Sequence, residues 1–260
     1  MSNSLYVASR SGDQAHGNWG PIARLDRITD GWRFLYVEGA RTLPSFQPFY
    51  EFPDLDRVYE SDDLFPLFTN RLLSKSRPEY EAWLTWGGFN PSEPPEPIAL
   101  LGVTEGRRVT DPIEVFPCPQ PDVDGCYLNR FFVHGVRWMP EPAQACILKM
   151  KAGERLALLP DRFNESDRNA VALRPLDDST GRYLIGYIPR YLAADVCQLF
   201  DQCDVEFIEV TVLRVNPDAP WQQRLLCQMN ACWPDGFRPC STAAFQPIRA
   251  EYPLASVVQR

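Results

Sequence analysis

The sequence is poor in the residues that build metal and catalytic centres. It has two histidines, His16 and His134, and none of its eight cysteines forms a C-x-x-C pair. Structural zinc sites usually show that tight spacing, and metal-dependent hydrolases need Asp/Glu clusters that do not stand out here. We therefore expect no metal, no cofactor and no catalytic activity, with reduced thiols and with His134 packed in the core.

Long hydrophobic segments are also missing. No apolar run approaches the roughly 18 residues of a membrane helix. The opening MSNSLYVASRSG lacks a basic region followed by an apolar core, which would mark a secretory signal. We expect a cytoplasmic protein without membrane contact. Its 260 residues suit one large or two modest domains and can bury a sizeable core without a disulfide or metal.

Charge is unevenly distributed along the chain. Residues 1–125 hold 11 Lys/Arg and 19 Asp/Glu, a balance of −8, whereas residues 126–233 hold 12 and 13, a balance of −1. The acidic front half should be repelled by nucleic acid, but the back half is neutral enough to carry a local basic patch. The two halves are thus expected to have different partners.

Two proline-rich stretches, 90–97 and 116–125, divide the chain, because they are stiff and cannot continue a helix or a central strand. We expect an α+β protein of two domains. Residues 1–118 should form a β-sheet with helices, residues 124–233 a small β-barrel with helices, and residues 234–260 a C-terminal coil. Because proteases cut exposed linkers, fragments near 1–118 and 124–260 are expected to fold independently.

The front half begins with two alternating segments, 20–28 and 31–39, joined by a Thr29-Asp30-Gly31 turn. A helix capped at Ser76 should follow and end at Gly87. Residues 98–116 look like two short strands around a Glu105-Gly106 turn.

The helix before Gly87 is rich in aromatic residues. Tyr80, Trp83 and Trp86 lie mostly on one of its faces. Core packing is the favoured explanation for two tryptophans in such a place. The helix is nevertheless more aromatic than a small domain usually requires, so part of this face is a candidate partner-binding surface.

In the back half, residues 131–138, 154–160, 169–176 and 182–189 read as strands, with a turn at 178–181. A helix opened by Pro189 and two further strands, 205–215 and 222–233, complete the pattern. The loop LLPDRFNESDRNAV carries Asp161, Asn164 and Asp167 between two apolar strands. These polar residues either close the loop by Asx turns or hold a ligand. The two explanations are equally weighted for Asp167, and loop closure is favoured for Asn164.

The order of strand, D-x-x-N-x-x-D-x-N-A loop, strand, G-Y-I-P-R and helix resembles the HIRAN domain over about residues 128–232. The matching residues are Asp161, Asn164, Asp167, Asn169, Ala170, Gly186, Tyr187, Pro189, Ala193 and Ala194. The resemblance implies a small β-barrel like the DNA-end-binding module of eukaryotic fork-remodelling translocases. In those modules the pocket holds the 3′ end of single-stranded DNA.

The same resemblance implies a set of DNA-binding residues. An Arg-aromatic pair on the first strand falls on Arg137 and Trp138, and the loop carboxylate falls on Asp167, with Arg168 and Asn169 beside it. The aromatic residue before that carboxylate is replaced by Ser166, which cannot stack on a base. Arg137 could pair with a phosphate, Trp138 could stack on a base, and Asp167 could accept from a 3′-hydroxyl.

The front half resembles the first N-terminal subdomain of HipA-type serine/threonine kinases. The matching residues are Phe65, Phe68, Leu72, Leu73, Leu100, Leu101 and Gly102, although Ser74-Lys75 replaces the family's Pro-Glu. In bacterial three-gene relatives this subdomain is a separate antitoxin, HipS. The chain shows no glycine-rich phosphate loop and no H-R-D or D-F-G phrase, so we expect no kinase core.

Together these patterns predict a non-enzymatic antitoxin or regulatory subunit that neutralises a HipA-type kinase and carries a HIRAN domain. The alternative is a stand-alone module that binds single-stranded DNA 3′ ends in DNA repair or phage defence. An enzyme is the least favoured possibility. A neighbouring kinase gene would favour the first over the second.

Overall fold

The computed structural model describes residues 3–11, 18–108, 110–176 and 183–249. The chain divides into two units, each built around its own sheet. Unit 1 takes in residues 1–72, 97–118 and 240–260, and unit 2 takes in residues 73–96 and 119–239. The chain does change unit next to the second proline-rich stretch, but residues 73–96 and 240–260 group differently from the expected 1–118 and 124–260 division.

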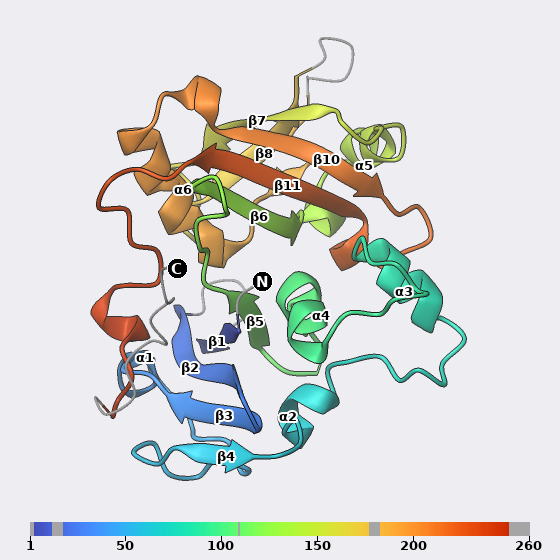
Figure 1. The fold of residues 1–260 in the computed structure, drawn as a ribbon. Coiled ribbons are helices and arrows are strands. Elements are labelled where there is room, and N and C mark those ends of the chain that lie inside the picture. Colours follow the sequence, from blue (N-terminus) through green and yellow to red (C-terminus); the bar gives the residue numbers. More distant parts are fainter. Residues whose placement is uncertain (1–2, 12–17, 109, 177–182, 250–260) are drawn as a thin grey trace. The chain divides into compact units, whose positions relative to one another are not determined.

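Unit 1 contains a five-stranded antiparallel sheet in the order β4-β3-β2-β1-β5 (Figure 1). The predicted hairpin is present, because Ile28 pairs with Gly31 and leaves Thr29 and Asp30 as the turn between β2 and β3. The strands are β1 (Ser4–Ser11), β2 (Asn18–Ile28), β3 (Gly31–Tyr36), β4 (Tyr59–Ser61) and β5 (Ile113–Pro117).

An aromatic core holds this sheet to its covering segments. The rings of Phe34 and Phe52 stack with their centroids 3.9 Å apart. The buried Tyr36 hydroxyl donates to the carbonyl of Phe52 and accepts from the amide of Phe49, so it fixes the loop over the core. Buried aromatic rings supply much of the hydrophobic stabilisation in such a cluster. The short helices of this unit are α1 (Gly39–Thr42), α2 (Pro66–Thr69), α4 (Pro97–Thr104) and η4 (Ala243–Phe245).

The prediction of two strands within residues 98–116 is wrong for the first of them. Residues 97–104 form the helix α4, and only β5 is a strand. Pro97 occupies the first helical position, where its missing N–H is harmless. A short continuous apolar run has no period that separates a buried strand from a buried helix. The turn itself is present, with positive φ at both Glu105 and Gly106.

Residues 240–249 join unit 1 rather than forming a separate coil. Pro247 forms a β-bridge with Val37, and the amide of Ile248 donates to the carbonyl of Tyr36 at 3.1 Å. The ring of Phe245 packs edge-on against Tyr6, with centroids 4.9 Å apart. Unit 1 is therefore completed by residues that lie more than 100 positions beyond β5.

Unit 2 contains a six-stranded antiparallel sheet in the order β6-β11-β10-β7-β8-β9. One further bridge joins its two ends, because the backbones of His134 and Tyr187 exchange hydrogen bonds of 2.8 and 2.9 Å. The sheet therefore curls toward a closed barrel, as expected. The strands are β6 (Cys126–Phe132), β7 (Arg155–Pro160), β8 (Val171–Pro175), β9 (Gly186–Tyr187), β10 (Glu209–Val215) and β11 (Leu225–Cys232).

Helices accompany this sheet at its edges and on its face (Figure 1). The long helix begins directly after Pro189, as predicted, and buries its apolar side. The expected hairpin turn at 178–181 lies outside the described residues. The helices of unit 2 are α3 (Tyr80–Trp86), α5 (Glu141–Ile147), α6 (Arg190–Gln202), η1 (Val136–Trp138), η2 (Val205–Phe207) and η3 (Trp221–Gln223).

The predicted strand over residues 131–138 is only partly correct. β6 ends at Phe132, and residues 136–138 form the 3₁₀ turn η1. Gly135 causes the change of direction, because its φ of +74° lies in the left-handed region that interrupts a strand. Arg137 and Trp138 are consequently displayed on a turn after the strand rather than on the strand itself.

Two further predictions are wrong, namely that all cysteines are reduced and that Ser76 caps α3. Cys203 and Cys232 form a disulfide, although reduced thiols were expected. The predicted capping at Ser76 does not occur, because α3 begins at Tyr80 with Glu79 as its N-cap and without a side-chain cap. Gly87 does end the helix, as predicted.

Independent folding of residues 1–118 and 124–260 stays a prediction. Each unit consists of segments that are separated in the sequence, and this decides what either fragment would contain. A fragment ending at residue 118 would carry the α3 segment without the sheet of unit 2 and would lack the segment after 239 that completes unit 1. Neither fragment would contain a whole unit.

Candidate nucleic-acid interface

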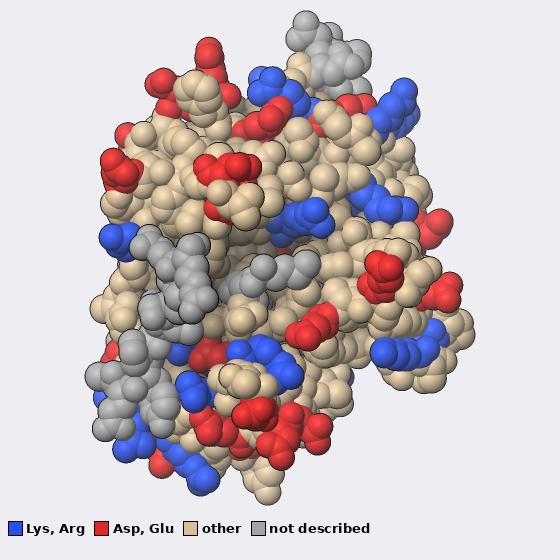
Figure 2. Space-filling model, viewed as in Figure 1, with Lys and Arg blue, Asp and Glu red and all other residues tan. Residues whose placement is uncertain are grey.

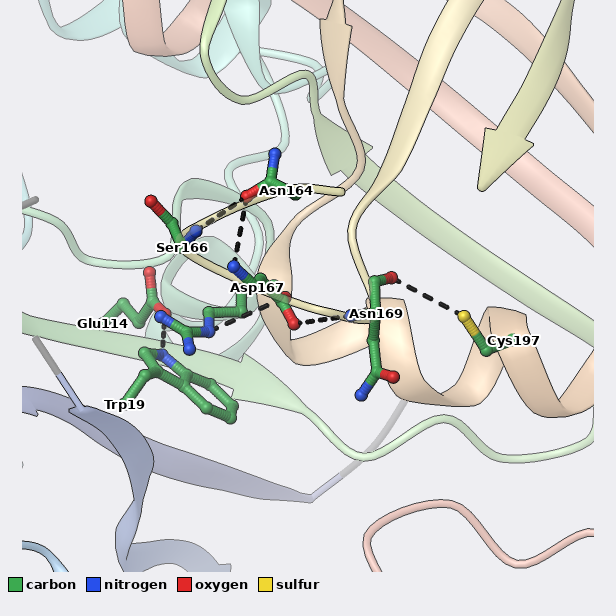
Figure 3. Close-up of polar contacts among 8 residues, drawn as sticks. Trp19, Glu114, Asn164, Ser166, Asp167, Asn169 and Cys197 are labelled. Carbon is green, nitrogen blue, oxygen red and sulfur yellow. Dashed lines mark hydrogen bonds and ion pairs between the residues drawn. The ribbon is translucent and has the colours of Figure 1, made fainter. Parts of the chain in front are cut away.

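The loop between β7 and β8 is organised by its own polar side chains (Figure 3). The Asn164 side chain accepts hydrogen bonds from the amides of Ser166 and Asp167, each at 3.1 Å. Its Nδ2 donates to Asp161 Oδ2 at 3.1 Å. Both the oxygen and the nitrogen of the Asn164 side chain thus help to close the loop, which agrees with the explanation favoured for it.

Asp167 is held in a defined orientation but keeps acceptor capacity. Its Oδ1 accepts from the amide of Asn169 at 2.9 Å, and its Oδ2 lies 3.6 Å from Nε of Arg190, the first residue of α6. An ionised carboxylate offers about four lone-pair positions. The Asx turn and the long ion pair leave room for a further donor. The loop-closing and ligand-holding explanations for Asp167 are therefore compatible.

Tyr187 connects the loop to the segment that carries η1. Its hydroxyl donates to Asp161 Oδ2 at 3.0 Å. Burial raises the pKa of Tyr187, and the hydrogen bond to Asp161 with its negative charge raises it further. A Cβ added at Gly135 would lie 3.4 Å from the Tyr187 ring. One tyrosine thus contacts both the start of the acidic loop and the residue directly before η1.

Arg137 and Trp138 form an exposed pair on η1. The guanidinium of Arg137 lies 5.0 Å from the ring centroid of Trp138, and Trp138 is 77% exposed. The turn beneath them is tied to α5, because Nε2 of Gln144 donates to the carbonyl oxygens of Val136, Arg137 and Met139 at 3.4, 3.3 and 2.9 Å. An exposed indole on a fixed turn presents a flat surface that an unpaired base can stack on.

A second Trp-Arg pair, which the sequence did not reveal, lies on a neighbouring turn. η3 contacts η1 and carries Trp221, whose ring centroid lies 4.6 Å from the guanidinium of Arg224. Arg224 also donates to the carbonyl oxygens of Pro217 and Ala219, which fixes its position. Trp221 is 36% exposed. The only signal in the sequence was a Trp and an Arg three positions apart in a loop after Pro220.

The remaining predicted residues of the loop differ in exposure. Arg168 is exposed, whereas Asn169 is half-buried and its carbonyl accepts from Sγ of Cys197 on α6 at 3.6 Å. Ser166 occupies the position where the family's aromatic was expected. A different aromatic residue of the same loop, Phe163, is 96% exposed and was not among the predicted site residues.

The three aromatic residues predicted to hold a partner all lie in unit 2 rather than in the acidic front domain. Trp83 is only 8% exposed, and its ring lies 6.1 Å from that of Tyr80. The carbonyl of Trp86 accepts from Nδ2 of Asn216 at 3.1 Å, which ties α3 to the segment between β10 and β11. Trp83 is thus a packing residue, and Tyr80 and Trp86 are half-buried.

Comparison with known proteins identifies part of the chain. The family model of the HIRAN domain matches residues 127–230, so this segment, from β6 to β11, is a HIRAN domain. Among curated proteins, the comparison found no significant match. Two solved structures are similar. The crystal structure of the HIRAN domain of human HLTF is 18% identical, with a TM-score of 0.30, and the match covers 42% of this chain and 80% of that one. A Lactobacillus plantarum protein is 21% identical, with a TM-score of 0.30 and coverages of 41% and 96%.

The described residues show neither a membrane-spanning helix nor a cluster of metal ligands. No helix there is long and apolar enough to cross a membrane. Within the same ranges, no group of three or more His, Cys, Asp or Glu side chains is placed to hold a metal ion.

Proposed function

We propose that the HIRAN domain of this chain binds the 3′ end of single-stranded DNA, without catalytic activity. The observation that carries the proposal is the exposed Trp138 with Arg137 stacked on it, held on a turn that Gln144 fixes from α5. A large apolar ring kept in water on a rigid turn gains free energy when a partner covers it. Every base has a face that can stack on such a ring, which makes this surface suited to single strands of any sequence.

The polar groups supply the remaining contacts. Arg137 and Arg168 are exposed and positively charged, so each could pair with a backbone phosphate. Asp167 can accept a hydrogen bond from a terminal 3′-hydroxyl but would repel a 3′-phosphate. Trp221 on the adjacent η3 offers a second ring for a neighbouring base.

The distribution of charged residues argues for a modest affinity of the HIRAN domain for single-stranded DNA. The HIRAN half is nearly neutral overall, and on the face that Figure 2 shows, the described Lys and Arg residues alternate with Asp and Glu instead of forming one continuous basic area. Weak net attraction means that a few direct contacts, rather than a general positive field, must hold the strand.

Fluorescence anisotropy with the full chain tests this proposal. A short single-stranded oligonucleotide should bind, and a blunt duplex of the same sequence should bind much more weakly. If Arg137 and Arg168 each contact one phosphate, log K should fall with log salt with a slope of about −1.4. Equal binding of the duplex, or no binding of either form at low salt, would refute the proposal.

The antitoxin function expected from the likeness of residues 1–118 to HipS remains a prediction. The buried Trp83 is not accessible as an anchor in this structure, so of the three predicted aromatic residues a HipA-type kinase could contact only Tyr80 and Trp86. The matched HIRAN domain supports the DNA-binding alternative, and for that reason we develop the latter. Co-purification with the product of a neighbouring kinase gene would test the antitoxin function.

A further inference from the structure

Three cysteines of unit 2 meet at one end of its sheet. Cys203, the C-cap residue of α6, forms a disulfide with Cys232, the last residue of β11, and their Cα atoms are 6.7 Å apart. The third, Cys126, is the first residue of β6 and lies directly opposite Cys232 in the β6-β11 ladder. A thiol is therefore the cross-strand neighbour of one sulfur of an existing disulfide.

The register places the Cys126 and Cys232 side chains on the same face of the sheet. Directly opposed residues in an antiparallel pair point to the same side, with Cβ atoms about 4.5–5.5 Å apart. The pairing of Arg130 with Gln228 confirms this face, because Nε of Arg130 donates to Oε1 of Gln228 at 3.4 Å. Cys126 is exposed on this face and Cys232 is half-buried.

The backbone of Cys126 is also fixed. Its amide donates to Oδ1 of Asp122 at 2.8 Å, and its carbonyl accepts from the amide of Asp122 at 2.8 Å. Oδ1 of Asp122 accepts from the amide of Asp124 at 2.9 Å as well. This turn holds the first residue of β6 in register opposite Cys232, with Sγ of Cys126 lying 4.0 Å from the carbonyl oxygen of Asp124.

We propose that Cys126, Cys203 and Cys232 form a thiol–disulfide exchange site. The Cys126 thiol loses its proton to solvent, and the thiolate attacks Sγ of Cys232. The Cys126–Cys232 bond forms, the Cys203–Cys232 bond breaks, and Cys203 leaves as a thiolate that takes up a proton. The step conserves the number of thiols and disulfides, so it needs no external oxidant or reductant.

The exchange converts one linkage of the fold into another. With Cys203 bonded, the end of α6 is tied to the end of β11. With Cys126 bonded, the tie joins β6 to β11, and the end of α6 loses its covalent link to the sheet while the Cys203 amide keeps its helical hydrogen bond to the Leu199 carbonyl. Exposed disulfides are the labile ones that act in regulation rather than in permanent bracing, and both residues of this bond are partly exposed. The site is accordingly an exchangeable covalent tether of α6.

Alkylation with peptide mapping tests this site in the full chain, purified without reductant. The protein is unfolded in mildly acidic guanidinium chloride with excess N-ethylmaleimide, which stops exchange and labels every thiol. The exchange site predicts partial labelling of both Cys126 and Cys203 and none of Cys232. The fully buried Cys227 should label completely, which makes it an internal standard.

Cys126→Ser is the matched control. Without its attacking thiol, Cys203 should stay bonded, and its labelling should fall at least about tenfold to background. Complete labelling of Cys126 with none of Cys203 in the parent protein would show a static disulfide, and labelling of all three cysteines would show that no disulfide is present. Unchanged labelling of Cys203 in the Cys126→Ser protein would likewise overturn the proposal.

Discussion

Replacing Trp138 and Trp221 together by alanine is expected to abolish measurable binding of single-stranded DNA. Each base stacked on an aromatic ring contributes about 1–3 kcal/mol, so Trp138→Ala alone should weaken binding by roughly 5- to 150-fold. The two turns that carry these rings contact each other, so both rings are expected to serve the same strand. Anisotropy titrations of the parent protein, the single variants and the double variant measure these effects.

The folding control is simple for Trp138→Ala, because Trp138 is largely exposed and its removal leaves no cavity. The melting temperature of Trp138→Ala should stay close to that of the parent protein. Tyr50→Ala, which removes a fully exposed aromatic residue outside the HIRAN domain, should leave binding unchanged. If Tyr50→Ala weakens binding as much as Trp138→Ala does, the effect is nonspecific and the stacking surface is wrongly placed.

Trp83→Ala is expected to destabilise the protein strongly. Trp83 is buried beside the fully buried Leu84 on α3. Removing a buried tryptophan leaves a cavity and costs about 3–5 kcal/mol, a large part of the stability of an ordinary domain. Urea unfolding, followed by circular dichroism, should show a lower midpoint in the transition that belongs to unit 2.

Trp86→Ala is the matched control on the same helix, because Trp86 is half-buried and its contact with Asn216 involves only the backbone carbonyl. Trp86→Ala should lower the free energy of unfolding clearly less than Trp83→Ala does. A Trp83→Ala protein that keeps its stability to within about 1 kcal/mol but loses a protein partner would contradict the packing role and restore the anchor explanation.

Local patterns predicted the parts of this structure that depend on neighbouring residues. The β2-β3 hairpin follows from alternating residues around Thr29-Asp30-Gly31, and the ordering of the β7-β8 loop follows from Asn164 and Asp167. The start of α6 follows from Pro189. These features need few contacts with distant parts of the chain, which explains why the sequence was sufficient for them.

The features that were missed depend on packing between distant segments. α3 belongs to unit 2 through contacts such as that of Trp86 with Asn216, which lies between β10 and β11 and is 130 residues away in the sequence. The Cys203–Cys232 disulfide joins residues 29 positions apart, and no spacing rule identifies such a pair. Trp221 became a candidate only when the fold placed η3 beside η1. The apolar run of α4 has no period that distinguishes a helix from a strand.

The most direct test of the central claim is a comparison of two oligonucleotides that differ only at the 3′ end, one with a hydroxyl and one with a phosphate. The parent protein should bind the hydroxyl end more tightly, because Asp167 accepts from a hydroxyl and repels a phosphate. In Asp167→Asn the charge is gone while an oxygen remains to accept from the amide of Asn169, so the preference should disappear through tighter binding of the phosphate end. Equal affinity of the parent protein for both ends, or an unchanged preference in Asp167→Asn, would contradict a 3′-end site at this loop.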